Sequence, residues 1–194
     1  SRRQRQMCIR DSGMIAIIDY GVGNLFSLRS SLTHLGLEAV VTADAQTIRK
    51  ADRLILPGVG AFGDAMDKLS ATGLVPVIRE QAAQKPLLGI CLGMQLLFEK
   101  SYEYGEHEGL GFVKGEVCPL EPDLKDKSLK VPQIGWNALH IVRDDPLFRY
   151  IREGEYVYYV HSYYGKNCTE STLAVSDYSI PCLLYTSDAA DDLI

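Results

Sequence analysis

The sequence predicts an α/β fold with three layers, in which helices cover both faces of a central, mainly parallel sheet. In the first half of the chain, short apolar runs alternate with segments where leucine recurs at helical spacing, as in βαβ units. Beyond Gly109 the apolar runs become shorter and turn residues separate them. This change predicts a small antiparallel excursion in the second half before the parallel sheet resumes.

The first half contains two predicted βαβ units. The first consists of a strand, a helix that stops at Gly36, and a second strand: residues 14–18, 25–35 and 37–41. The second consists of two strands, residues 53–56 and 86–91, around helical segments at residues 65–69 and 74–83. After the second unit we expect a further helical segment at residues 95–99.

The second half contains shorter predicted strands, at residues 111–117, 138–142, 156–161 and 173–176. The stretch 121–130 mixes charges of both signs with Pro122, so we expect a solvated loop there.

Composition limits the classes of partner. The chain has 194 residues, 46% of them hydrophobic, which is enough to bury the core of one domain. Its net charge is −5. Binding to nucleic acid or to an anionic membrane surface would require clustered Lys and Arg, so small molecules and proteins remain as partners.

The five cysteines are odd in number and lack paired metal-ligand spacing, and the chain has no long apolar run. We therefore expect a cytoplasmic protein that uses no metal and no cofactor.

Residues 1–13 and 182–194 depart from the pattern of the chain between them and resemble translated sequencing adapters. We expect these tails to be non-native and residues 14–181 to form the domain. A genuine basic arm and acidic tail is the alternative.

The most informative motif is Gly89-Ile90-Cys91-Leu92-Gly93, at the predicted passage from strand to helix. A sharp turn at this point presents the Cys91 sulfur at a helix N-terminus, where unpaired amides favour the thiolate. The turn leaves no room for a Cβ atom two residues before or after Cys91, which explains the two glycines. The amide of Leu92 can then stabilise an oxyanion. A buried structural cysteine is the alternative.

A glycine-rich loop, Gly58-Val59-Gly60, follows the predicted strand 53–56. In a parallel sheet this loop would lie beside the elbow at Cys91 and could supply the second oxyanion donor, from Val59 or Gly60. The alternative is that this segment is an ordinary turn after a strand, with no role at the elbow.

Together these residues closely resemble class I glutamine amidotransferases, and among them the glutaminase subunits of imidazole glycerol phosphate synthases. Besides the motif at Cys91, four segments carry the resemblance, in family order: Ile15–Leu25, Leu56–Phe62, Pro132–Asn137 and His161–Tyr164. The family fold is flavodoxin-like. The resemblance implies that glutamine is hydrolysed and that the ammonia passes through a channel to a (β/α)8-barrel cyclase, the partner in a heterodimer of histidine biosynthesis.

The resemblance also implies roles for single residues. Cys91 is the nucleophile, and Gly58, Gln95 and the segment His161-Ser162-Tyr163 bind glutamine. Gln95 lies four residues after Cys91, and an ordinary exposed helical glutamine is the alternative. His161 could instead be a substitute base or a half-buried structural histidine.

Trp136, the one tryptophan of the chain, is either a side chain that fills the core or an anchor at an interface. The resemblance favours the interface, because in the family the segment that contains Trp136 and Asn137 faces the cyclase. Asp19 and Asn24 are expected to cap the first helix or to contact the partner.

The family's general base belongs to a His-x-Glu element, and none of the four histidines is followed two residues later by an acid. The resemblance therefore predicts a truncated subunit with little or no turnover. Another class I amidotransferase or cysteine-elbow hydrolase, or a non-catalytic docking subunit, remains the alternative.

Overall fold

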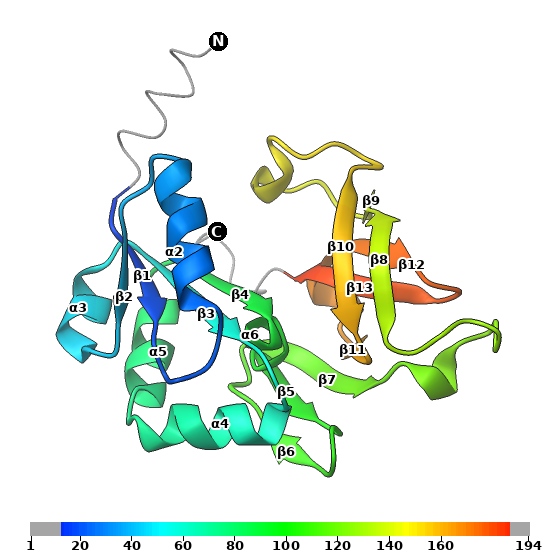
Figure 1. The fold of residues 1–194 in the computed structure, drawn as a ribbon, viewed down its shortest axis with the longest axis horizontal. Coiled ribbons are helices and arrows are strands. Elements are labelled where there is room, and N and C mark those ends of the chain that lie inside the picture. Colours follow the sequence, from blue (N-terminus) through cyan, green and yellow to red (C-terminus); the bar gives the residue numbers. More distant parts are fainter. Residues whose placement is uncertain (1–12, 187–194) are drawn as a thin grey trace. The chain divides into compact units, whose positions relative to one another are not determined.

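The computed structural model describes residues 13–186, and their side chains up to residue 182. The chain divides into two compact units, one ending at Leu96 and the other beginning at Leu97. Each unit has its own sheets, whose strands are labelled in Figure 1. No helix in the described part of the chain is long and apolar enough to cross a membrane.

The first unit is built on a parallel sheet of four strands. Its elements, in chain order, are β1 (Ile15–Ile18), α2 (Leu25–His34), β2 (Ala39–Thr42), α3 (Ala45–Lys50), β3 (Arg53–Gly58), α4 (Phe62–Ala71), α5 (Val75–Ala82), β4 (Leu87–Cys91) and α6 (Leu92–Gln95). The strand order is β2-β1-β3-β4, and every neighbouring pair is parallel. This arrangement confirms the α/β fold predicted from the alternation of apolar runs.

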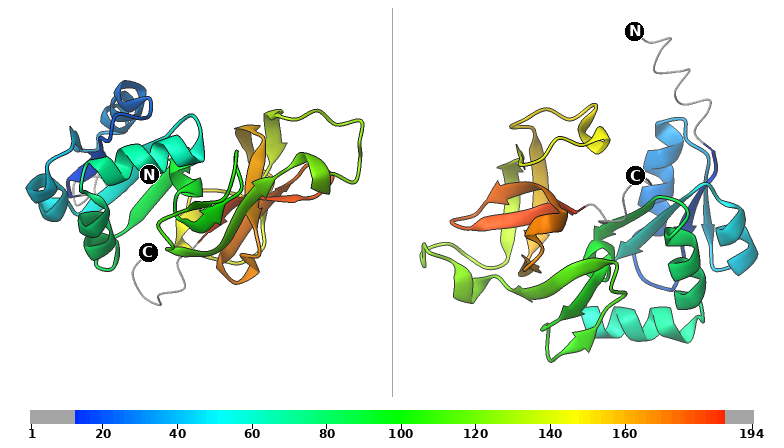
Figure 2. Two further views of the ribbon diagram at one scale, coloured as in Figure 1. Left: turned by 90° about the horizontal axis from the view of Figure 1, so that it is seen from below. Right: turned by 180° about the vertical axis from the view of Figure 1, so that it is seen from behind.

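Helices cover both faces of this sheet. Three leucines of α2 (Leu25, Leu28 and Leu32) pack on the cluster of Ile15, Ile17 and Ile55. The connection from β1 to β2 runs across the sheet in the opposite direction to those from β2 to β3 and from β3 to β4. Because parallel crossovers are right-handed, α3 and α5 belong to the face opposite α2 (Figures 1 and 2).

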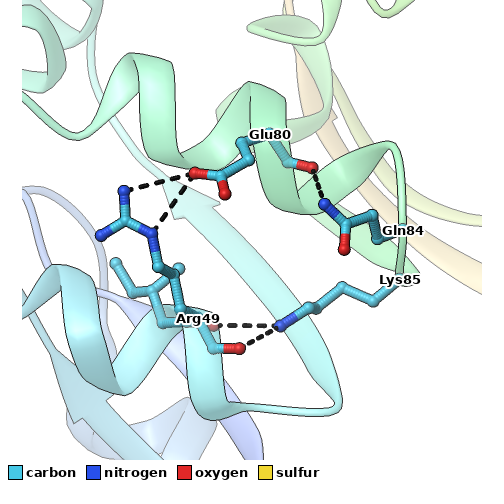
Figure 3. Close-up of polar contacts among 5 residues, drawn as sticks. Arg49, Glu80, Gln84 and Lys85 are labelled. Carbon is cyan, nitrogen blue, oxygen red and sulfur yellow. Dashed lines mark hydrogen bonds and ion pairs between the residues drawn. The ribbon is translucent and has the colours of Figure 1, made fainter.

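Side chains at the N-terminus of α2 and at the contact of α3 with α5 stabilise these helices. Asn24 caps α2 and accepts a hydrogen bond from the Ser27 amide, which confirms the expected capping role. The Lys85 ammonium donates to the carbonyl oxygens of Ile48 and Arg49 at the end of α3 (3.2 and 2.9 Å), where a cation interacts favourably with the helix dipole. Arg49 also pairs with Glu80 of α5 (Figure 3).

The second unit consists of three small sheets. Its strands are β5 (Phe98–Ser101), β6 (His107–Glu108), β7 (Val113–Pro119), β8 (Gln133–Ala138), β9 (His140–Ile141), β10 (Tyr156–His161), β11 (Tyr163–Lys166), β12 (Thr172–Asp177) and β13 (Pro181–Thr186), and its 3-10 turns are η1 (Glu121–Asp123), η2 (Pro146–Phe148) and η3 (Thr169–Ser171). The sheets have the orders β11-β7-β5-β6, β10-β8 and β13-β12-β9. All pairings are antiparallel except that of β5 with β7.

Three local expectations differ from the structure. The chain is not helical at residues 95–99, because α6 ends at Gln95 and Phe98 begins β5, paired with β7. Residues 133–137, for which no strand was predicted, form strand β8 together with Ala138, against β10. Among the described residues no further strand joins the parallel sheet after β4. Of the predicted tails, residues 182–186 belong to β13, and residues 1–12 and 187–194 lie outside the described residues.

Candidate active site

Cys91 lies at a sharp passage from strand to helix. It is the last residue of β4 and the N-cap of α6, with φ 56° and ψ −120°. A residue with a Cβ atom rarely adopts a positive φ, and such strain persists only where the surrounding structure imposes it. The residue is exposed, and its thiol is free. Both features are those expected of a nucleophile elbow.

The glycines on either side of Cys91 are required by close packing. A Cβ atom on Gly93 would collide with the carbonyl oxygen of Leu56, on the neighbouring strand β3. A Cβ atom on Gly89 would lie 2.5 Å from the Cα atom of Met94. Real Cβ atoms do not approach backbone atoms so closely. The structure thus confirms the steric reason for the two glycines.

The glycine-rich loop after β3 lies beside the elbow. β3 and β4 are parallel neighbours, and their register pairs Gly58 with Cys91. Val59 and Gly60, the next two residues, are exposed, and Gly60 has a φ of 93°. Leu92 directly follows Cys91, and as the first residue of α6 its amide has no partner within the helix. Val59 and Gly60 directly follow the residue that pairs with Cys91. The role of these amides as oxyanion donors remains a prediction.

A buried phenol, Tyr20, lies under this loop. Its hydroxyl donates a hydrogen bond to the carbonyl oxygen of Pro57 at 2.7 Å. Burial, and to a lesser extent the negative charge of the Cys91 thiolate, raise the pKa of Tyr20 to about 12. The phenol therefore stays protonated at neutral pH. Tyr20 received no role from the sequence, and the available signal was an aromatic residue two positions after a buried strand.

Helix α6 is shorter than expected, with four residues. A helix of one turn has only a small dipole. The unpaired amides of that turn are therefore the main source of positive potential at the sulfur. Gln95 is the last residue of α6 and is half-buried. Its proposed contact with glutamine remains a prediction.

The predicted glutamine-binding segment lies in the second unit, where His161 is part of a chain of hydrogen bonds. Its Nδ1 faces the carbonyl oxygen of Tyr163 (2.9 Å), and its Nε2 faces Oε1 of Gln133 (2.7 Å). Gln133 donates to Asn137, which donates to the carbonyl oxygen of Asp177 (2.9 and 3.0 Å). Burial lowers the pKa of His161. With both ring nitrogens engaged, the imidazole is poorly suited to act as a substitute base.

The backbone of Ser162 is also engaged, because its carbonyl oxygen accepts from the Leu120 amide at 2.9 Å. The structure brings Cys91, Leu92, Gln95 and the loop Gly58–Gly60 together in the first unit. It places Ser162 and Tyr163 beside His161 in the second unit, at the passage from β10 to β11.

Trp136 lies on an apolar face formed by β8 and β10. Its ring contacts that of Tyr158, the residue opposite it, with centroids 5.4 Å apart. The face also contains the neighbouring cross-strand pair Ile134 and Val160, and all four side chains are more than half exposed. Asn137 points the other way, into the hydrogen-bond chain of His161. Its predicted place at a partner interface would therefore have to be indirect.

Among the residues with described side chains, no group of three or more His, Cys, Asp or Glu residues could hold a metal ion. The first unit holds an exposed thiol in a strained turn at the start of a helix, which is an arrangement suited to nucleophilic chemistry.

Comparisons with known proteins identify the family of the chain. The family described as "Glutamine amidotransferase class-I" matches residues 16–181. The chain is similar to the imidazole glycerol phosphate synthase subunit HisH of Sulfurimonas denitrificans, at 50% identity over 153 residues, 78% of this chain and 73% of that protein. The HisH subunit of Caldanaerobacter subterraneus subsp. tengcongensis is 49% identical over 169 residues, 86% of this chain and 81% of that protein.

A crystal structure of a glutamine amidotransferase superposes with a TM-score of 0.67 and 16% identity, over 89% of this chain and 85% of that chain. That likeness concerns the fold, whereas the family match and the identity to the HisH subunits concern the sequence. The family match and the identity to the HisH subunits show that the chain belongs to the class I glutamine amidotransferase family.

Proposed function

We propose that this protein hydrolyses glutamine to glutamate and ammonia, with Cys91 as the nucleophile. The observation that carries the proposal is the strained, exposed Cys91 at the end of β4, in register with Gly58 of the neighbouring strand. Membership of the class I glutamine amidotransferases supplies the substrate. A structural cysteine would have no need of a positive φ or of exposure.

The reaction follows from this geometry. The Cys91 thiolate attacks the side-chain amide carbon of glutamine, and the carbonyl oxygen becomes an oxyanion that accepts hydrogen bonds from Leu92 and from Val59 or Gly60. The carbon–nitrogen bond then breaks, and the nitrogen leaves as ammonia after it gains a proton. Water hydrolyses the remaining glutamyl thioester, which releases glutamate and restores the thiol.

We propose that Gly58, Gln95, His161, Ser162 and Tyr163 bind glutamine, because their sequence segments resemble those of the family. The relatives are named as subunits of imidazole glycerol phosphate synthase. The ammonia is accordingly proposed to pass to a (β/α)8-barrel cyclase, in the synthesis of histidine and in the cytoplasm. The exposed face of Trp136 and Tyr158 fits such a protein partner, because aromatic side chains are enriched where interfaces bind most strongly.

Turnover also needs a proton donor and acceptor, and no His-x-Glu element is present among the 194 residues. We propose that these residues by themselves turn over glutamine slowly or not at all. The thiol can still be tested, because alkylation by a chloroketone requires the thiolate and a glutamine pocket but no full catalytic cycle.

The experiment is labelling of the 194-residue chain with the chloroketone analogue of glutamine, followed by mapping of the modified residue by mass spectrometry. We expect one modification, at Cys91, that excess glutamine slows and excess asparagine does not. The half-buried Cys118 is the internal control. Equal labelling of Cys91 and Cys118, or no protection by glutamine, would refute the proposed function.

A further inference from the structure

We propose that Tyr20 is a positioning residue of the oxyanion loop. By this proposal its hydroxyl holds the Pro57 carbonyl oxygen in place and so orients the segment Gly58–Gly60 for binding of the substrate oxyanion. The inference rests on the proposed function, since it concerns the loop beside Cys91. It assigns Tyr20 no contact with glutamine or with the reacting atoms.

The contact joins two distant parts of the chain. Tyr20 lies two residues after the end of β1, and Pro57 lies near the end of β3. The phenol is buried, and its hydroxyl donates to the Pro57 carbonyl oxygen at 2.7 Å. That oxygen lies near the carboxyl edge of the parallel sheet, because the register of β3 with β4 ends one residue later, at Gly58 and Cys91. The side chain of Tyr20 thus ties the end of β3 to the segment that follows β1.

Holding the carbonyl oxygen of Pro57 fixes more than one atom. The peptide unit is planar, so the orientation of this oxygen also sets the direction of the Gly58 N–H. Gly58 is closely packed, because a Cβ atom there would lie 2.6 Å from the Gly93 nitrogen and 3.0 Å from the Tyr20 oxygen. The loop is therefore anchored at Gly58, and its freedom begins at Val59 and Gly60, which are exposed.

The chemistry of the phenol suits an anchor better than a proton donor. Its O–H is directed at the Pro57 carbonyl oxygen, and burial together with the Cys91 charge keeps it protonated. The hydrogen bond is thus present whether Cys91 is a thiol or a thiolate. Phenylalanine at this position would keep the packing of the ring and remove only the hydrogen bond.

The test compares Tyr20→Phe with the unmodified 194-residue chain in two labelling reactions of Cys91. The glutamine chloroketone has a carbonyl oxygen that the loop would bind, whereas iodoacetamide alkylates the thiolate without forming an oxyanion. We expect the chloroketone rate to fall about three- to tenfold, the loss expected for one neutral hydrogen bond. The iodoacetamide rate should remain within twofold.

Amide hydrogen exchange gives a second measurement that does not depend on labelling. Tyr20→Phe should raise the exchange rates of the Gly58, Val59 and Gly60 amides severalfold and leave that of Ile55, within β3, unchanged. The matched control is Tyr178→Phe, which removes another phenol hydrogen bond to a backbone carbonyl, that of Lys130 (2.8 Å). It should alter neither the labelling rates nor the exchange of the loop.

The outcomes separate this inference from the proposed function. If the unmodified chain shows no glutamine-protected labelling, the proposed function fails. If the unmodified chain labels as expected but Tyr20→Phe labels at the same rate, with unchanged exchange at Gly58–Gly60, the positioning role is refuted. A parallel fall in both labelling rates would also refute it, because it would indicate general damage to the elbow.

Discussion

The two units of this protein place their candidate functional groups in different ways. In the first unit the elements of the site are backbone atoms: the turn at Cys91, the amides around it, and glycines that neighbouring strands leave no room to replace. In the second unit the candidate groups are side chains, in the hydrogen-bond chain of His161 and on the exposed face of Trp136. The first site therefore depends on the conformation of the backbone, and the second on the identity of its side chains.

The difference predicts how each unit tolerates change. A site made of backbone cannot be altered without moving a strand, so substitutions there should act on stability and on reactivity together. A surface made of side chains can lose a group while its strands remain in place. Substitutions in the second unit should therefore separate binding from stability.

The largest effect is expected for Gly93→Ala. The added methyl group would collide with the Leu56 carbonyl oxygen, and relief requires β3 or α6 to shift. We expect a loss of about 3 kcal/mol or more in the free energy of unfolding, measured with urea, and loss of chloroketone labelling at Cys91.

Gly73→Ala is the matched control. Its Cβ atom would meet nothing within 4 Å, but Gly73 has a φ of 72°. We expect a loss of about 1 kcal/mol from backbone strain alone, with labelling unchanged. Equal losses in the two variants would contradict the close packing of the elbow.

These contrasts explain which parts could be predicted from the sequence. Strands β1, β3 and β4 are apolar runs, and the elbow has a local glycine pattern, so both were predicted correctly. Helix α3 was missed because only Ile48 of its six residues is buried, which leaves no periodicity to detect. Most of strand β8 was not predicted because its pattern is inverted, with the polar Gln133 buried and the aromatic Trp136 exposed. The pairing of β5 with β7 joins distant segments, which local patterns do not reveal.

The next largest effect is expected at the apolar face of the second unit. Trp136→Ala should change the free energy of unfolding by less than about 1 kcal/mol, because the ring is 66% exposed. Binding to a cyclase subunit of imidazole glycerol phosphate synthase, measured by calorimetry, should weaken about 10- to 100-fold. Tyr150→Ala, which removes an equally exposed aromatic outside this face, is the control. Unchanged affinity in Trp136→Ala would exclude this face as the docking surface.

A smaller effect is expected from relief of strain at the nucleophile. Cys91→Gly should raise the free energy of unfolding by about 1 kcal/mol, because glycine adopts a φ of 56° without a Cβ penalty. Cys91→Ala keeps the Cβ atom and should gain nothing. Both variants lose the thiol, so the difference in their free energies of unfolding reports the relieved strain less the cost of the larger unfolded-state entropy of glycine. A Cys91→Gly variant less stable than Cys91→Ala would show that the turn stores too little strain to offset that entropy.

The smallest effect is expected from the titration of His161, where two influences oppose each other. Burial favours the neutral imidazole, whereas the oxygens of Tyr163 and Gln133 at its two nitrogens favour the doubly protonated form. Burial is the larger influence, so the pKa of His161 lies below that of the unfolded chain.

Between these two pKa values the unfolded state binds more protons, and the free energy of unfolding must fall as the pH is lowered through about 6.5. Urea unfolding between pH 7.5 and 5.5 should show a shallow loss of stability that His161→Gln reduces. If His161→Gln instead steepened the loss on acidification, the two N–H hydrogen bonds would outweigh burial. The imidazolium would then be the form that the second unit stabilises.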